Sequence, residues 1–127
     1  MFLSYSSQDT EWAREFQNDC ENEGLSTYLA SRSIEAGADW EEEIWEAIRG
    51  CELFVALLTT NALASDWCQF EAGAARGLRK KLVPILRHIS PTNLVGALRQ
   101  FQAREAQSRA QQLHVVRELR GLIDRHG

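Results

Sequence analysis

The feature that most limits the fold of this chain is an unbroken apolar run in its middle, residues 53–58, with the sequence LFVALL. Because polar and apolar residues do not alternate in it, the run is typical of a central strand that is covered on both faces. Such a strand needs neighbouring strands and a layer of helices on each side. A chain of 127 residues with 44% hydrophobic content has room for one core of this kind, so we expect a single domain over 1–127.

Shorter apolar runs alternate with helical patterns along the rest of the chain. We expect strands at 2–5, 25–30 and 81–86, with Pro84 at a sheet edge or a strand end. We expect helices at 9–23, 40–49, 63–79 and 103–125, the last with the apolar stripe Leu113, Val116, Leu119, Leu122 and Ile123. Residues 90–102 show no clear pattern.

This alternation predicts an α/β fold: a flavodoxin-like three-layer sandwich with a central, mostly parallel sheet and helices on both faces. In such folds the ligand binds outside the carboxyl ends of the strands. We therefore expect the site beside the loops that follow the first two strands, residues 5–8 and 31–39.

Charge is unevenly distributed along the chain. Residues 1–75 carry a net charge of −12 and residues 76–127 a net charge of +8. The positive residues are scattered among leucine, glutamine and alanine without interleaved aromatics, which favours a solvated helical face over a nucleic-acid site. Self-association of acidic faces on basic faces is the sharper alternative.

The sequence predicts a cytoplasmic protein with no membrane contact. No apolar run approaches the roughly 20 residues of a membrane span, and the first residues lack the pattern of a signal peptide. The three cysteines, Cys20, Cys51 and Cys68, are odd in number and form no CxxC pair, so neither a disulfide framework nor a metal site is indicated. We expect them to be reduced and partly buried.

Several chemistries lack the residues they need. A phosphoacceptor domain of this topology needs acidic residues after the first strand and an aspartate after the third, where this chain has Ser6-Ser7 and Thr59-Thr60. No glycine-rich phosphate loop is present. The histidines (His88, His114 and His126) all lie in the basic half and do not suggest a hydrolase triad.

Glu71 is the strongest candidate for chemistry. It follows Trp67 by four positions, so both side chains lie on one face of the predicted helix. An aromatic ring can stack on a flat cationic leaving group while the carboxylate stabilises positive charge on an adjacent sugar carbon. By spacing alone, a solvent-facing glutamate and a tryptophan in the core explain the same pattern.

The chain resembles the Toll/interleukin-1 receptor (TIR) domain family along nearly its whole length. The similar segments are FLSYS at 2–6, the loop 31–39 with IEAG, the strand LFVALL followed by TTN, and S-x-W-C-x-x-E ending at Glu71. The last is similar to a helix motif of TIR domains that cleave NAD+. Four motifs in the family's order make the match specific.

The resemblance implies an NAD+ nucleosidase, acting as a hydrolase or as a cyclase, that needs no metal or other cofactor. Glu71 matches the family's catalytic glutamate. The positions that match substrate-binding residues are Phe2, Ser4, Tyr5, Arg32, Ser33, Ile34, Glu35 and Trp67. The family also implies homotypic TIR–TIR self-association, an attached or associated sensing module, and a role in immune signalling such as bacterial defence.

The chain departs from some active members at two places. They carry basic residues where this chain has Ser6-Ser7, and an acidic residue where it has Ala30-Ser31. The alternative function is a TIR scaffold that signals by homotypic contact without catalysis; such domains usually lack the glutamate that this chain retains.

Overall fold

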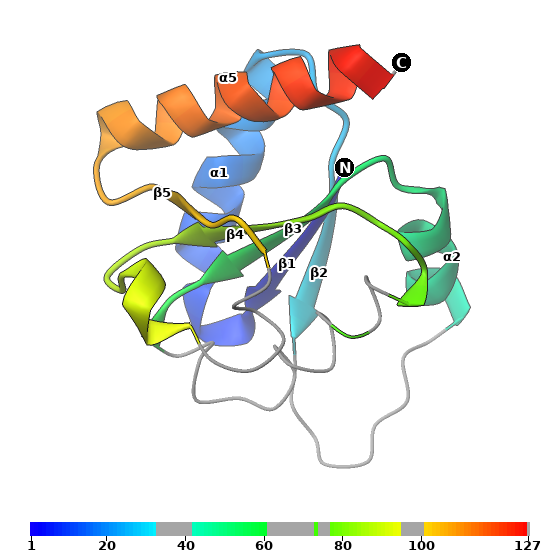
Figure 1. Ribbon diagram of the computed structural model, residues 1–127, viewed down its shortest axis with the longest axis horizontal. Coiled ribbons are helices and arrows are strands. Elements are labelled where there is room, and N and C mark those ends of the chain that lie inside the picture. Colours follow the sequence, from blue (N-terminus) through cyan, green and yellow to red (C-terminus); the bar gives the residue numbers. More distant parts are fainter. Residues whose placement is uncertain (33–41, 61–72, 74–76, 95–100, 127) are drawn as a thin grey trace.

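The computed structural model describes residues 1–32, 42–60, 73, 77–94 and 101–126. In this part of the chain, parallel strands form one sheet in the order β2-β1-β3-β4-β5 (Figure 1). The strands are β1 (Phe2–Ser6), β2 (Tyr28–Arg32), β3 (Phe54–Leu58), β4 (Leu82–Leu86) and β5 (Arg104–Glu105). This order is that of flavodoxin-like sheets, which confirms the predicted fold class.

Helices cover both faces of the sheet. They are α1 (Thr10–Asn22), α2 (Glu42–Gly50) and α5 (Arg109–His126), with short 3-10 turns at Ser7–Asp9 and Pro91–Asn93. Figure 1 shows α1 and α5 packed together and α2 apart from them. The described helices include none with the length and apolarity that crossing a membrane requires. The predicted helix over 63–79 lies mostly outside the described residues.

β3 is the centre of the core, as its sequence predicts. Its side chains alternate between two buried clusters: Val55 and Leu57 face α1 and α5, whereas Phe54 and Leu58 face the layer that contains Ile48 of α2. Each of these side chains is fully buried. Burial on both faces is why the run contains no polar residue.

The second strand begins three residues later than predicted because Leu25 belongs to the end of α1. The Leu25 amide donates to the Cys20 carbonyl and the Gly24 amide to the Glu21 carbonyl, both at 2.9 Å. With Gly24 at φ 81°, these bonds form a Schellman cap, in which Leu25 packs back onto the helix. The apolar residue that suggested a strand is therefore a helix cap.

Pro84 does not end β4; it ends the pairing of β4 with β5. Ile85 lies opposite Arg104, and the Ala106 amide donates to the Leu86 carbonyl at 2.8 Å. In this register the main-chain groups of Pro84 also face β5, because residues two apart point the same way. Proline has no N–H for the next ladder bond, so β5 has only two residues. The predicted start of the last helix at residue 103 is wrong, because Arg104 and Glu105 form β5 and the helix begins at Arg109.

Gln112 has no exposed surface, although it lies on the α5 face predicted to be apolar. Its side-chain oxygen accepts hydrogen bonds from the Trp12 indole and the Arg87 guanidinium, both at 2.8 Å. Its side-chain nitrogen donates to Asp19 at 2.8 Å and to Glu15 at 3.1 Å. The buried amide is tolerated because all of its hydrogen-bonding groups have partners.

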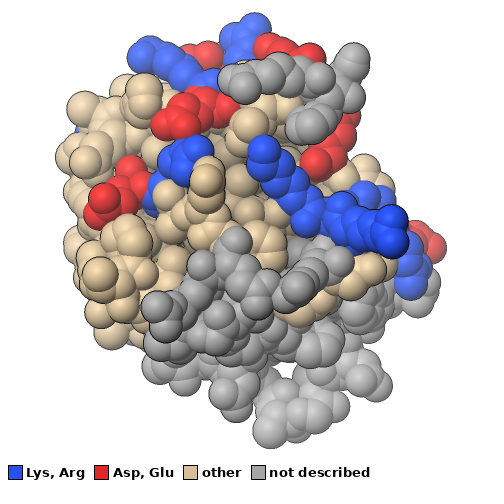
Figure 2. All heavy atoms as spheres, viewed as in Figure 1, with Lys and Arg blue, Asp and Glu red and all other residues tan. Residues whose placement is uncertain are grey.

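The acidic and basic halves of the sequence meet inside the domain. Arg109 of α5 forms two 2.6 Å hydrogen bonds to buried Asp19 of α1, and these bonds raise the pKa of Arg109. Arg109 also pairs with Glu15 at 3.1 Å, and Arg120 with Glu23 at 3.4 Å. Figure 2 shows basic and acidic side chains interleaved in the region of α5. Part of the opposite charge of the two halves is therefore paired between α1 and α5. The uneven charge of the sequence is by itself no argument for self-association.

Cys20 is expected to be unreactive in the folded protein. Burial raises the pKa of its thiol from 9.0 to about 12, so the reactive thiolate is absent at neutral pH. The thiol pKa is higher in the folded protein than in the unfolded chain. The free energy of unfolding therefore keeps its full contribution from the protonated Cys20 thiol below pH 9.0 and loses it as the pH rises towards about 12. Labelling at pH 8 followed by peptide mass spectrometry should modify half-buried Cys51 before Cys20. Equal Cys20 labelling in native and urea-unfolded protein would contradict this.

Candidate functional site

The strand order creates a topological switch point between β1 and β3. From β1 the chain continues to β2 on one side, and from β3 it continues to β4 on the other. Ligands of open parallel sheets bind outside the carboxyl ends of strands at such a point. The sequence placed the site beside the loops after the first and second strands. The structure adds the end of β3, which shares the switch point with β1. Residues 33–39 of the second loop lie outside the described residues, so their predicted place beside the site stays a prediction.

Phe2 lies in the core, at the opposite end of β1 from the switch point. It is 1% exposed, and its ring stacks on Tyr28 with centroids 5.6 Å apart and contacts Phe54 at 4.8 Å. Four residue-to-residue steps along the strand, about 13 Å, separate it from Ser6. Core packing accounts for this aromatic residue.

Ser4 and Tyr5 lie nearer the carboxyl end of β1 and point to opposite faces of the sheet. Tyr5 is 8% exposed and packs in the cluster beneath α1 and α5. Ser4 is 1% exposed and lies opposite Ala30 of β2 and Ala56 of β3. Ser4 and Ala56 therefore occupy neighbouring, buried positions on the sheet face that α2 helps to cover.

The other predicted site residues are mostly beyond the described part of the chain. Arg32 is the last residue of β2, at the carboxyl edge. Ser33, Ile34, Glu35, Trp67 and Glu71 lie outside the described residues, so their predicted roles are neither confirmed nor contradicted.

A hydrogen bond that the sequence analysis missed spans the switch point. The Thr59 hydroxyl donates to the Asp9 carboxylate at 2.6 Å. Thr59 directly follows β3 and is 6% exposed, while Asp9 ends the 3-10 turn that follows β1. The sequence indicated Asp9 as part of a helix start and gave no sign that its side chain points towards β3.

The turn after β4 is held by a side chain from the segment before α5. His88 has φ 65°, a left-handed conformation that is uncommon for a residue other than glycine. Gln107 accepts a hydrogen bond from the His88 amide at 2.7 Å and donates to the Ile89 carbonyl at 2.6 Å. The carboxyl edge beside β4 is thus fixed from outside the turn, with the His88 side chain exposed.

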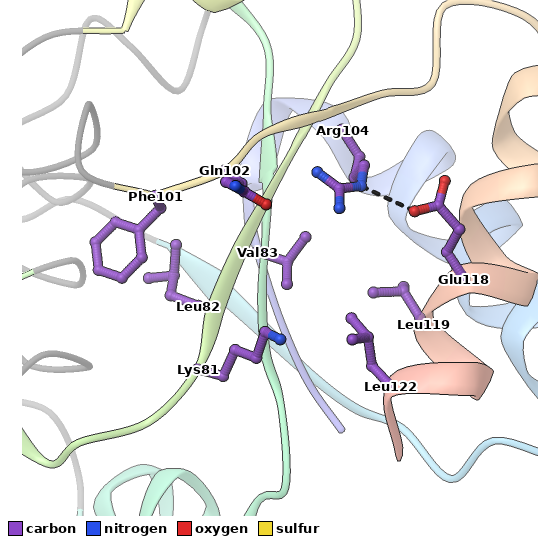
Figure 3. A pocket seen from close by; sticks show the side chains of 9 residues that line it. All are labelled: Lys81, Leu82, Val83, Phe101, Gln102, Arg104, Glu118, Leu119 and Leu122. Atoms are coloured by element: carbon purple, nitrogen blue, oxygen red, sulfur yellow. Dashed lines mark hydrogen bonds and ion pairs between the residues drawn. The ribbon is translucent and has the colours of Figure 1, made fainter. Parts of the chain in front are cut away.

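A pocket of about 270 Å³ lies away from this edge (Figure 3). It is lined by the first residues of β4, by the segment that leads into β5 and by the second half of α5. In the close-up, Arg104 and Glu118 point towards one another across its rim and form a 2.9 Å ion pair. Because the pocket is beside the amino-terminal half of β4, it is not the candidate site.

The described residues contain no group of three or more His, Cys, Asp or Glu side chains that could hold a metal ion. His114 is exposed and pairs with Glu118 at 3.1 Å on the surface of α5. Within the described part of the chain, the carboxyl edge therefore offers hydroxyl groups, the Asp9 carboxylate and small residues rather than a preformed catalytic triad.

Comparison with protein families matches residues 1–117 to the family described as "TIR domain". A similar curated protein is the "Probable 2' cyclic ADP-D-ribose synthase BdTIR" of Brachypodium distachyon. The two are 30% identical over 97 residues, which are 75% of this chain and 43% of the relative. The chain thus spans less than half the length of that protein.

Two solved structures share the fold. The TIR domains of the activated Roq1 resistosome superpose with a TM-score of 0.57 at 19% identity, covering 91% of this chain and 66% of theirs. A metazoan TIR-STING receptor from C. gigas superposes with a TM-score of 0.64 at 20% identity, covering 90% of this chain and 38% of its own. At these identities the similarity concerns the fold alone.

Proposed function

The chain belongs to the TIR domain family, and we propose that it is an NAD+ nucleosidase that cleaves the bond between nicotinamide and ribose. The proposal is carried by its similarity to the plant relative named as a probable cyclic ADP-ribose synthase. Synthesis of a cyclic ADP-ribose from NAD+ begins with loss of nicotinamide, so hydrolysis and cyclisation share this first step. The retained Trp67 and Glu71 supply the aromatic ring and the carboxylate that this step needs.

In the proposed reaction the C1′–N bond of NAD+ breaks, and its electron pair leaves with nicotinamide as a neutral ring. The ribose carbon becomes oxocarbenium-like, and the Glu71 carboxylate stabilises its positive charge. Attack by water at C1′, with loss of one proton, gives ADP-ribose. Attack by an adenine nitrogen or a ribose hydroxyl of the same molecule gives a cyclic isomer instead.

The remaining predicted residues are assigned to binding. Ser4 and Tyr5 are proposed to border the nucleotide near the carboxyl end of β1, and Trp67 to stack on the departing ring. The loop residues Arg32, Ser33, Ile34 and Glu35 are proposed to reach the site of a neighbouring domain in an assembly. Phe2 is buried at the far end of β1, so we assign its contribution to packing beneath the site.

We further propose that self-assembly activates the enzyme and that it acts in immune or defence signalling together with a sensing module. The alternative is a scaffold that works through homotypic contact without catalysis. The two differ in one measurement: when salt or dilution weakens assembly, an assembled enzyme loses NAD+ cleavage in parallel, whereas a scaffold has no cleavage to lose.

The proposed function predicts nicotinamide release from NAD+ by the concentrated protein. Chromatography of the reaction should show nicotinamide together with either ADP-ribose or a cyclic isomer, and the second peak names the reaction. Sedimentation of the same sample reports whether the protein is assembled. Absence of nicotinamide from a sample that is demonstrably assembled would favour the scaffold.

A further inference from the structure

We propose that Asp9 and Thr59 form a brace across the switch point that positions the chain leaving β3 for NAD+ cleavage. The inference rests on the proposed function and adds two positioning residues to it. Neither residue is assigned contact with the reacting atoms. Three observations carry the inference: the unusual use of Asp9, the burial of Thr59, and the rigid anchoring of the elements that the pair connects.

Asp9 occupies the N-cap position of α1 but does not cap the helix. An aspartate at this position ordinarily accepts a hydrogen bond from an amide of the first helical turn. In this structure the Asp9 side chain makes no such bond. It accepts the Thr59 hydroxyl at 2.6 Å instead, from a residue 50 positions away in the chain. A local preference set aside for a long-range contact is typical of a functional site.

Thr59 provides the other half of the brace. Its side chain is 6% exposed, and its hydroxyl donates to the carboxylate of partly exposed Asp9, so the hydrogen bond is charge-assisted and part-buried. The residue directly follows β3, where the chain leaves the sheet on the way to Glu71. The bond therefore fixes the point from which the segment with the proposed catalytic glutamate departs.

Both ends of the brace are attached to rigid structure. α1 is held to α5 through Trp12 and Asp19, which both bond to buried Gln112. β3 is fully buried at the centre of the sheet. Between these fixed elements, the bond holds the first residue after β3 against the end of the 3-10 turn at the switch point. Because catalysis depends on the placement of reacting groups, a displacement of about 1 Å at this point can lower a rate by roughly 100-fold.

The test compares three threonine variants by steady-state kinetics of nicotinamide release. Thr59→Val preserves the shape of the side chain but removes the donor, and we expect kcat to fall roughly 10- to 100-fold with a smaller change in KM. Thr59→Ser keeps the donor and should restore most of the activity. Thr27→Val is the matched control: Thr27 also donates to a carboxylate, that of Glu21 at 3.4 Å, but next to the amino end of β2. It should leave kcat unchanged.

Variants of Asp9 test the pair as a unit. Asp9→Asn retains an acceptor and should be milder than Asp9→Ala. The double variant Asp9→Ala/Thr59→Val should be no slower than the worse single variant, because both changes break the same bond. Thermal unfolding of every variant separates lost placement from lost folding.

The outcomes distinguish failure of the inference from failure of the proposed function. Full activity in a folded Thr59→Val protein overturns the brace while leaving the enzyme in place. Effects of Asp9→Ala and Thr59→Val that simply multiply in the double variant also overturn it. If the parent protein releases no nicotinamide, the proposed function fails and the inference fails with it.

Discussion

The Glu71→Gln variant is expected to fold normally and to lose nearly all NAD+ cleavage. Glutamine keeps the size of the side chain but removes the negative charge that, in the proposed reaction, stabilises the oxocarbenium-like ribose. Loss of a preorganised charge at such a position lowers rates by about 10² to 10⁴. The loss should appear in kcat for nicotinamide release at saturating NAD+, because the charge develops in the transition state and not in the bound substrate.

A matched control is Glu52→Gln, which removes one exposed carboxylate from the turn before β3, at the amino-terminal end of that strand. It makes the same change in net charge and should cleave NAD+ at the parent rate. Thermal unfolding and sedimentation of all three proteins show whether folding and assembly are equal. Near-parent turnover by a folded, assembled Glu71→Gln protein would remove Glu71 from the catalytic role.

The second large effect is expected from Gln112→Leu. The substitution introduces an apolar side chain of similar volume in α5 and removes the hydrogen-bond partner that Gln112 provides to the Trp12 indole, Arg87 and Asp19. Asp19 keeps its two bonds to Arg109, and Arg87 keeps its bond to the Ala106 carbonyl, so the loss falls mainly on the buried Trp12 indole. Leaving a buried polar group unsatisfied costs about 1 to 3 kcal/mol, and we expect the free energy of unfolding to fall by roughly 2 kcal/mol. Urea denaturation at neutral pH measures it.

Gln111→Leu is the matched control for this prediction. It makes the same substitution at the neighbouring position, where the side chain is exposed, and should change the free energy of unfolding by less than about 1 kcal/mol. Gln112→Glu provides a second test. It places a carboxyl group against Asp19 and Glu15, so the variant should be less stable at neutral pH and should recover as the new group is protonated at lower pH. Equal stabilities of Gln112→Leu and Gln111→Leu would show that the buried network contributes little.

The hydrogen-bond network around Gln112 also explains how the domain uses its uneven charge. The acidic residues of α1 and the arginines of the second half are far apart in sequence but adjacent in space. Asp19 is buried and satisfied by Arg109 and Gln112, so its charge is not available to another copy of the domain. An assembly of this protein therefore needs surfaces other than the contact between α1 and α5.

The sequence predicted the parts of the fold that depend on local pattern. The central strand, the helix that follows β1 and the alternation of strands and helices all follow from the spacing of apolar residues, which the structure confirms. Its errors occurred where an apolar residue fits more than one local structure or where an element is too short to show a pattern. Leu25 suggested a strand but packs against the end of α1, and β5 has too few residues to show a strand period.

For the candidate site, the sequence supplied the candidates and the tertiary structure supplied the neighbours. Residue identity and spacing were enough to select Glu71, Trp67 and Ser4, because the resemblance depends on motifs within single segments. No local pattern shows that Asp9 reaches Thr59, or that Gln112 is buried between Trp12 and Asp19. These contacts join residues 50 or more positions apart, and they exist only because the parallel strand order brings β1 and β3 together and stacks α5 on α1. Short-range periodicity thus determined which elements form, whereas the packing of those elements decided which polar side chains meet.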